Sequence, residues 1–108
     1  MLTSYSELRN FLDKNIDEIL SKLGKTFDSN NFLDAFHNTY PSQYGEALLF
    51  AKTYRNLHCW TARWYLSRCS YVRDLGRDKK LRVSKNGNPT RNHRWEQIKK
   101  QNLPICNE

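Results

Sequence analysis

The stretch from Asn56 to Gly76 constrains the fold of this 108-residue chain more than any other. Its apolar and aromatic residues recur at helical spacing among arginines, and no acidic residue appears before Asp74. The pattern predicts one helix over Leu57–Cys69, about three and a half turns long at ~3.6 residues per turn. Two stripes run along it, and we expect one to hold a small core while the other meets a partner. The first stripe comprises Cys59, Ala62, Leu66 and Cys69, and the second comprises Trp60, Arg63, Trp64 and Ser67.

The positive charge of the chain is concentrated in its second half. Residues 1–54 carry five Lys or Arg and seven Asp or Glu, a balance of 5 − 7 = −2. Residues 55–108 carry thirteen and four, a balance of 13 − 4 = +9. Such an asymmetry is the electrostatic footprint of a protein that binds nucleic acid or another acidic surface, although it also suits a merely solvated basic surface. The partner that we expect is nucleic acid.

Length and composition indicate one globular domain of ordinary type. The first residues show neither a basic segment nor an apolar run, so we expect no signal peptide. The longest apolar run, Ala47–Ala51, is far shorter than the ~20 residues that a membrane helix needs, and no membrane partner is expected. Three cysteines without a CxxC motif suit free thiols in a reducing compartment, which predicts a cytoplasmic location.

Three further helices are predicted before the central one. Residues Ser4–Leu23 repeat apolar side chains at spacings of three and four, with Ser4 and Glu7 at capping-box spacing and Gly24 at the left-handed position beyond the end. This amphipathic helix is expected to pack on the domain or, alternatively, to pair with its own copy in a homodimer. After a connection at residues 25–31, a helix capped by Asp28 or Ser29 runs up to Pro41, and Ser42 caps a helix over Gln43–Tyr54.

The periodicity changes after Cys69. Residues 71–73 are β-like, Leu81–Ser84 alternates like a strand, and the Asn86-Gly87 pair predicts a hairpin turn. Residues Thr90–Trp95 are expected to return as the second strand, and a polar tail covers residues 99–108. The basic side chains of this predicted hairpin are Arg82, Lys85, Arg91 and Arg94.

The order of these elements resembles the winged helix-turn-helix family. The resemblance covers Phe27 to about Ile98 and depends on the order of F-L-D-A-F-H-N-T-Y-P-S-Q-Y, L-H-C-W-T-A-R-W-Y-L-S-R, V-R-D-L-G, L-R-V-S-K-N-G-N and R-W-E-Q-I. It implies an α+β, mainly helical fold with an extra N-terminal helix (1–25), a winged-helix core (26–98) and the polar tail. Gln43–Tyr54 and Leu57–Cys69 would be the paired helices, with Leu81–Trp95 as the wing. The turn between the paired helices lacks the glycine that it often contains.

The resemblance further implies double-stranded DNA as the partner. Arg63 and Arg68 would contact guanine from a helix in the major groove, and Thr61 and Ser67 would reach phosphate or base. The wing residues Arg82, Lys85, Arg91 and Arg94 would contact the DNA backbone or the minor groove. We therefore expect a transcriptional regulator or accessory factor of a bacterium, phage or mobile element.

Trp60 and Trp64 leave an alternative open. If both indoles are buried, only Thr61, Arg63, Arg68 and their neighbours are left to contact DNA. If both are exposed, base stacking or a protein partner is favoured over groove reading. The alternative function is accordingly a protein–protein interaction module that uses the N-terminal helix or the Trp60/Trp64 face.

Catalytic and metal-binding patterns are weak, and no enzyme activity, cofactor or metal is expected. His58 and Cys59 are adjacent and would point about 100° apart on a helix. A zinc site formed by Cys59, Cys69, Cys106 and a histidine lacks the close ligand pairs that such sites favour. Asp74 and Asp78 could hold a metal in a nuclease, but they suit surface charge as well.

Overall fold

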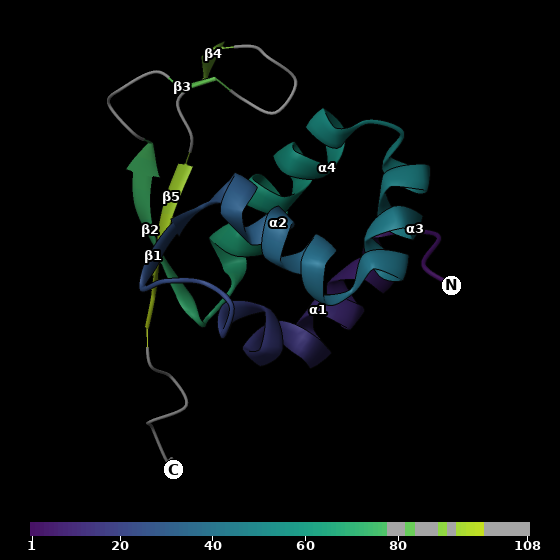
Figure 1. The fold of residues 1–108 in the computed structure, drawn as a ribbon, viewed down its shortest axis with the longest axis horizontal. Helices are drawn as coiled ribbons and strands as arrows, with labels where there is room; N and C mark the ends of the chain where they lie inside the picture. The colour runs from purple at the N-terminus through teal and green to yellow at the C-terminus, as the bar shows by residue number, and fades with distance from the viewer. Residues whose placement is uncertain (78–81, 84–88, 91–92, 99–108) are drawn as a thin grey trace.

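The computed structural model describes residues 1–77, 82–83, 89–90 and 93–98. The chain is α+β and mainly helical: helices gather on one side and a small sheet stands at the other (Figure 1). The elements in order are α1 (Tyr5–Leu20), β1 (Thr26–Asp28), α2 (Ser29–Thr39), α3 (Pro41–Ala51), α4 (Tyr54–Trp60), a π-helical turn (Thr61–Tyr65), a 3₁₀ turn (Leu66–Arg68), β2 (Val72–Arg77), β3 (Arg82–Val83), β4 (Pro89–Thr90) and β5 (His93–Gln97).

Helix α1 begins where the sequence predicts and ends earlier. The Ser4 hydroxyl accepts a hydrogen bond from the Glu7 backbone N–H at 3.3 Å. The Glu7 carboxylate instead accepts from the backbone N–H and hydroxyl of Thr3, and these bonds lower the pKa of Glu7. The predicted capping box is therefore only half formed. The helix closes at Ser21, and Gly24 has no positive φ, so the predicted left-handed end at Gly24 is wrong.

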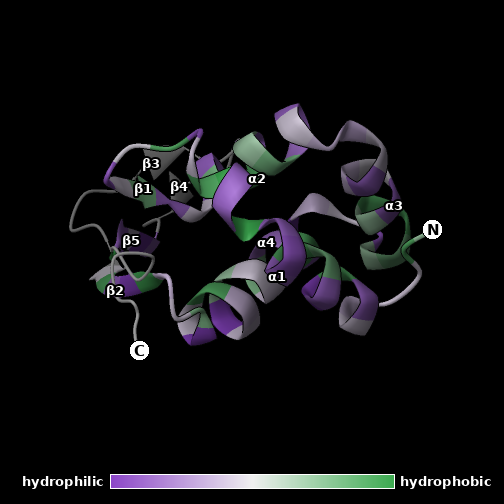
Figure 2. Cartoon of the chain, turned by 90° about the horizontal axis from the view of Figure 1, so that it is seen from below, coloured by the Kyte–Doolittle hydropathy of each residue, from purple (hydrophilic) through white to green (hydrophobic). Residues whose placement is uncertain are grey.

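The apolar stripe of α1 is buried in the core of the chain. Its buried side chains are Leu8, Leu12, Ile16, Ile19 and Leu20. Figure 2 shows apolar residues of α1 turned towards the other helices. The expectation of a homodimer depended on this stripe, and the structure does not support it because the stripe is already covered. The apolar stripe of helix α1 thus belongs to the core.

The predicted connection at residues 25–31 contains a strand. Thr26–Asp28 forms β1, and the sheet order is β1-β5-β2 with antiparallel neighbours throughout. A three-residue strand has too few positions to show an alternating pattern, so the sequence did not predict it. The strand forms because it pairs with a segment almost 70 residues away, where Trp95 lies opposite Phe27. The Asp28 side chain then caps α2 in a reciprocal box with Asn31, which confirms one of the two predicted caps.

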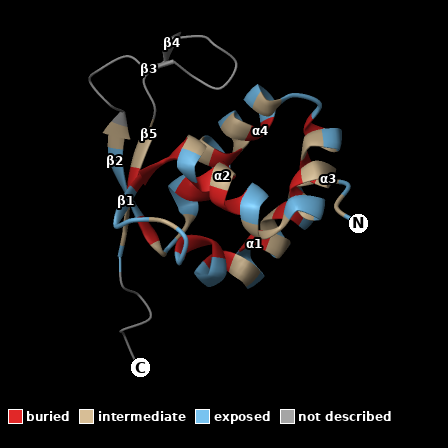
Figure 3. Cartoon of the chain, in the orientation of Figure 1, coloured by how far each residue is buried: buried red, intermediate tan, exposed pale blue. Residues whose placement is uncertain are grey.

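The core lies among the helices and extends to the sheet, as the buried residues in Figure 3 show. Trp95 on the central strand is 1% exposed, and its indole N–H donates to the Ser29 hydroxyl at 2.9 Å. Phe27, Phe32 and Phe36 are equally enclosed. The structure thereby joins the first turn of α2 to the middle of the sheet.

Helix α3 starts at Pro41, one residue before the predicted cap Ser42. Proline is favoured at the first helical position because its missing N–H has no partner there anyway. The buried residues of α3 are Tyr44, Ala47 and Ala51, whereas Tyr54 belongs to α4. None of the helices in the described part of the chain has the length and apolar character needed to span a membrane.

The turn between α3 and α4 has the backbone shape of a glycine turn without a glycine. Lys52 adopts φ +77°, and the Thr53 hydroxyl caps α4 by accepting from the Asn56 N–H at 3.0 Å. Asn56 was predicted to cap this helix, and that prediction is wrong because Thr53 is the cap. The Asn56 side-chain amide instead donates to the Ala51 carbonyl at 2.8 Å and closes the end of α3.

Replacing Lys52 by glycine is expected to stabilise the protein by about 0.5–1 kcal/mol. A left-handed conformation costs a residue with a Cβ roughly 1 kcal/mol or more, and the greater freedom of glycine in the unfolded chain offsets part of that gain. Urea unfolding measures the change. Lys52→Ala is the matched control, because it removes the same charge and keeps the Cβ. A glycine variant no more stable than the alanine variant would contradict the assignment of strain.

Candidate nucleic-acid interface

The segment predicted as one regular helix, Leu57–Cys69, changes its winding partway along. It begins earlier, at Tyr54, and α4 passes into the π-helical turn at Thr61, where the Leu66 N–H donates to the Thr61 carbonyl. A turn closed over five residues is wider than an α-helical one. Thr61, Tyr65 and Leu66 are consequently all buried on one side of the segment.

Two side-chain bonds hold this wide turn in place. The Thr61 hydroxyl donates to the Leu57 carbonyl at 2.7 Å. The Tyr65 hydroxyl donates to Asp13 on α1 at 3.0 Å, and burial, the largest cause, raises the pKa of Tyr65. The predicted contact of Thr61 with phosphate or base is therefore wrong, because its side chain is 1% exposed and faces the core.

The two predicted stripes are only partly correct. In the first, Leu66 is buried, Ala62 and Cys69 are half-buried, and Cys59 is exposed. In the second, Arg63, Trp64 and Ser67 are exposed and Trp60 is half-buried. The side open to water thus includes most of the second stripe together with Cys59.

Trp60 and Trp64 have different environments, which neither of the two expected cases describes. The Trp60 ring stacks on Tyr5 with centroids 4.9 Å apart and lies 5.9 Å from the Tyr65 ring, with the Arg9 guanidinium 5.6 Å from its centroid. Trp64 is 49% exposed and is approached by Arg68, whose guanidinium carbon lies 4.8 Å from the ring centroid. Trp60 anchors α1 to α4, and Trp64 faces solvent.

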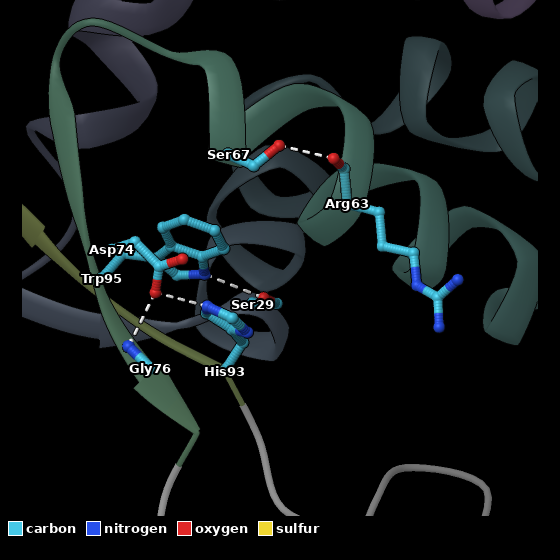
Figure 4. A network of polar contacts seen from close by, with 7 residues as sticks. All are labelled: Ser29, Arg63, Ser67, Asp74, Gly76, His93 and Trp95. Carbon is cyan, nitrogen blue, oxygen red and sulfur yellow. Dashed lines mark hydrogen bonds and ion pairs between the residues drawn. The ribbon is translucent and has the colours of Figure 1, made fainter.

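Four exposed cations occur in this segment and in the turn that leads into it. We call Lys52, Arg55, Arg63 and Arg68 the α4 basic surface, and all four are exposed. No acidic residue occurs between Glu46 and Asp74. The ion pairs seen within the described residues involve none of the four cations. Figure 4 shows the Arg63 side chain extended away from the ribbon.

The other predicted contact residues are placed as follows. The Ser67 hydroxyl donates to the Arg63 carbonyl and stays exposed. Arg94 lies in β5, half-buried, and donates to the Thr26 hydroxyl at 3.2 Å, so it is a sheet residue and not a wing residue. Arg82 begins β3, whereas Lys85 and Arg91 lie outside the described residues.

The predicted hairpin is present in outline, with different strands. β3 and β4 pair antiparallel around residues 84–88, and the predicted return strand Thr90–Trp95 is divided between β4 and β5. The strand predicted at residues 71–73 begins at Val72 and is longer than expected, running to Arg77 through an irregularity between Asp74 and Gly76. The φ of Gly76 is +85°. In Figure 1, β3 and β4 lie beyond the sheet, towards the end of the molecule at which α4 begins.

Asp74, a candidate metal ligand, is engaged at the base of this hairpin. Its carboxylate accepts from the Gly76 N–H at 2.6 Å and contacts the His93 imidazole, which stacks on Trp95 (Figure 4). Sequence reasoning did not single out His93, because its partner lies 19 residues away and only the antiparallel pairing of β2 with β5 brings the two side chains together. Asp78 and Cys106, which belong to the other candidate metal sites, lie outside the described residues.

Cys59, Cys69 and His58 lie in the part of the chain that the structure describes. No cluster of three metal-ligating side chains occurs there. Burial lowers the pKa of His58 and raises the pKa of the Cys69 thiol, so burial disfavours the charged form of each.

Comparisons of the chain with protein-family models, with curated proteins and with solved structures found no match.

Proposed function

We propose that this chain is a small DNA-binding protein built as a winged helix. The observation that carries the proposal is the α4 basic surface, whose exposed cations lie in a stretch of 27 residues without an acid. A phosphate backbone complements such a surface, and phosphate contacts supply most of the affinity of non-specific DNA binding. The same charge pattern would give duplex DNA a long-range attraction to this side of the molecule.

The arrangement of elements supports the winged-helix part of the proposal. Helix α3 packs on α4 across the short turn at Lys52 and Thr53, in the manner of paired helices. In the chain, β2 comes after α4. β5 pairs antiparallel with β2, and residues 78–92 join the two strands. A hairpin leaving the sheet at this point would serve as the wing.

In the proposed complex, the segment Tyr54–Arg68 enters the major groove. Arg63 and Arg68 reach base edges or phosphates, and Lys52 and Arg55 contact the backbone near the start of α4. Basic residues of the wing add backbone contacts. We further propose a binding role without catalysis, as a regulator or accessory factor of a bacterium, phage or mobile element.

Titration of duplex DNA at two salt concentrations tests the proposal. Four phosphate contacts would give a slope of about −3.6 in log affinity against log salt, so raising the salt from ~50 to ~200 mM would weaken binding ~150-fold. Fluorescence anisotropy with a labelled duplex measures this change. Binding that is insensitive to salt, or no binding at low salt, would contradict a phosphate-driven interface.

The exposure of Trp64 also fits a second candidate, a protein–protein interaction module on the same scaffold. Tryptophan and arginine are the residues most enriched at binding hot spots, and here they are in contact. An acidic protein would complement the α4 basic surface as DNA does. Absence of DNA affinity at low salt would favour this candidate, because the basic surface would then need another acidic ligand.

A further inference from the structure

Trp64 is the only aromatic side chain in the described part of the chain that is exposed to solvent, at 49%. The remaining tyrosines, phenylalanines and tryptophans there are buried or half-buried. Leaving a large ring in water forgoes the free energy of burial that the other aromatic residues obtain. A ligand that covers the flat apolar ring of Trp64 would therefore gain free energy by burying it.

The surrounding contacts hold Trp64 on the surface. It lies within the π-helical turn, an irregularity that is common at functional sites. The Arg9 guanidinium donates to the Trp64 carbonyl at 2.9 Å and ties this turn to α1. Trp60, four residues earlier, is enclosed by Tyr5 and Tyr65, so the two indoles do not share one environment despite their spacing.

Arg68 places a cation beside the Trp64 ring, and this combination is suited to binding a nucleobase. Its guanidinium lies over the indole at 4.8 Å, which leaves ring surface exposed beside a cation. Base stacking on an aromatic ring, supported by arginine, is how proteins bind unpaired bases. In continuous duplex DNA only base edges are presented in the grooves, because the faces are stacked on one another. An indole can therefore stack on a base face only where a base is unpaired or terminal.

We propose that Trp64 and Arg68 form a stacking site for an unpaired base, so that the preferred ligand is duplex DNA with a single-stranded overhang. The inference rests on the proposed DNA-binding function and adds the class of DNA. The duplex part is held by Lys52, Arg55 and Arg63, and the first unpaired base of the overhang lies on the Trp64 ring. Arg68 then contacts the phosphate beside that base.

The test compares three DNAs: a blunt duplex, the same duplex with an overhang, and the isolated overhang strand. We expect the overhang duplex to bind about tenfold more tightly than the blunt duplex, which is the effect of stacking one base. Trp64→Leu should reduce this ratio to about one, whatever its effect on blunt-duplex affinity, and Trp64→Phe should retain part of it. Arg63→Ala should weaken blunt and overhang duplexes alike, which separates groove contacts from stacking.

Leu49→Ala is the control for loss of exposed apolar surface, because Leu49 is 80% exposed on α3. It should leave the ratio unchanged. Equal binding of the blunt and overhang duplexes by the wild type, or an unchanged ratio in Trp64→Leu, would overturn the stacking site while leaving duplex binding intact. Single-strand binding as tight as that of the overhang duplex would also overturn it, since no junction would be needed. Absence of binding to all three DNAs would overturn the proposed function as well.

Discussion

Reversing two charges on the α4 basic surface, with Arg63→Glu and Arg68→Glu together, is expected to weaken duplex binding by at least about a hundredfold at ~0.1 M salt. Each substitution removes a cation that would lie against phosphate or a base edge and places a carboxylate there, and like charges across an interface cost several kcal/mol. Both side chains are exposed. The loss is therefore expected in binding and not in folding.

The variant is measured by anisotropy beside a control with the same net charge. Lys14→Glu with Lys22→Glu alters exposed cations on α1 and in the turn after it. Each pair of substitutions takes the formal charge from +7 to +3, since 7 − 4 = 3. The control should lose only the modest affinity expected from a change in overall charge. Equal losses in the two variants would show that net charge, and not this surface, determines binding.

Replacing Trp95 by alanine is expected to lower the free energy of unfolding by about 3–5 kcal/mol. The indole is 1% exposed at the centre of the sheet, so its removal leaves a large cavity beneath three strands. The Ser29 hydroxyl also loses the hydrogen bond from the indole at the first turn of α2. A loss of this size is a large part of the stability of a typical domain.

Chemical denaturation monitored by far-ultraviolet circular dichroism measures the change. Trp95→Phe should cost less, because it keeps much of the apolar volume and removes only the N–H donor and part of the ring. Trp64→Ala is the surface control and should change the stability by no more than about 0.5 kcal/mol. A Trp95→Ala variant as stable as that control would contradict the central position of Trp95 in the core.

The parts predicted well from the sequence are those in which the signal is local. The apolar repeat of α1 and a cap for α2 at Asp28 or Ser29 need only neighbouring residues to be recognised, and the structure has the cap at Asp28. The wide turn at Thr61 could not be predicted in this way. It depends on Tyr65 reaching Asp13, 52 residues away, and on the stacking of Trp60 against Tyr5.

The candidate site shows the same division. Arg63 and Arg68 were predicted as contact residues, and both are exposed, because a charged side chain seldom enters a core without a partner. Thr61 and Arg94 were assigned to the same site, but one is buried and the other is bonded within the sheet. Thr61 is small enough to be buried or exposed, and Arg94 is long enough to reach a partner within the sheet or outside it. Residue type alone therefore could not decide where either side chain lies.

By itself, the sequence determined the helical character of the chain, the cap at Ser4, and the acid-free stretch that makes one region basic. Helix periodicity, capping and charge are properties of neighbouring residues. Only the tertiary structure decided that β1 exists, that α1 is core, and that Trp64 faces solvent while Trp60 does not. These outcomes depend on which distant surfaces meet, because a three-residue strand or a tryptophan has no fixed environment until its partners are in place.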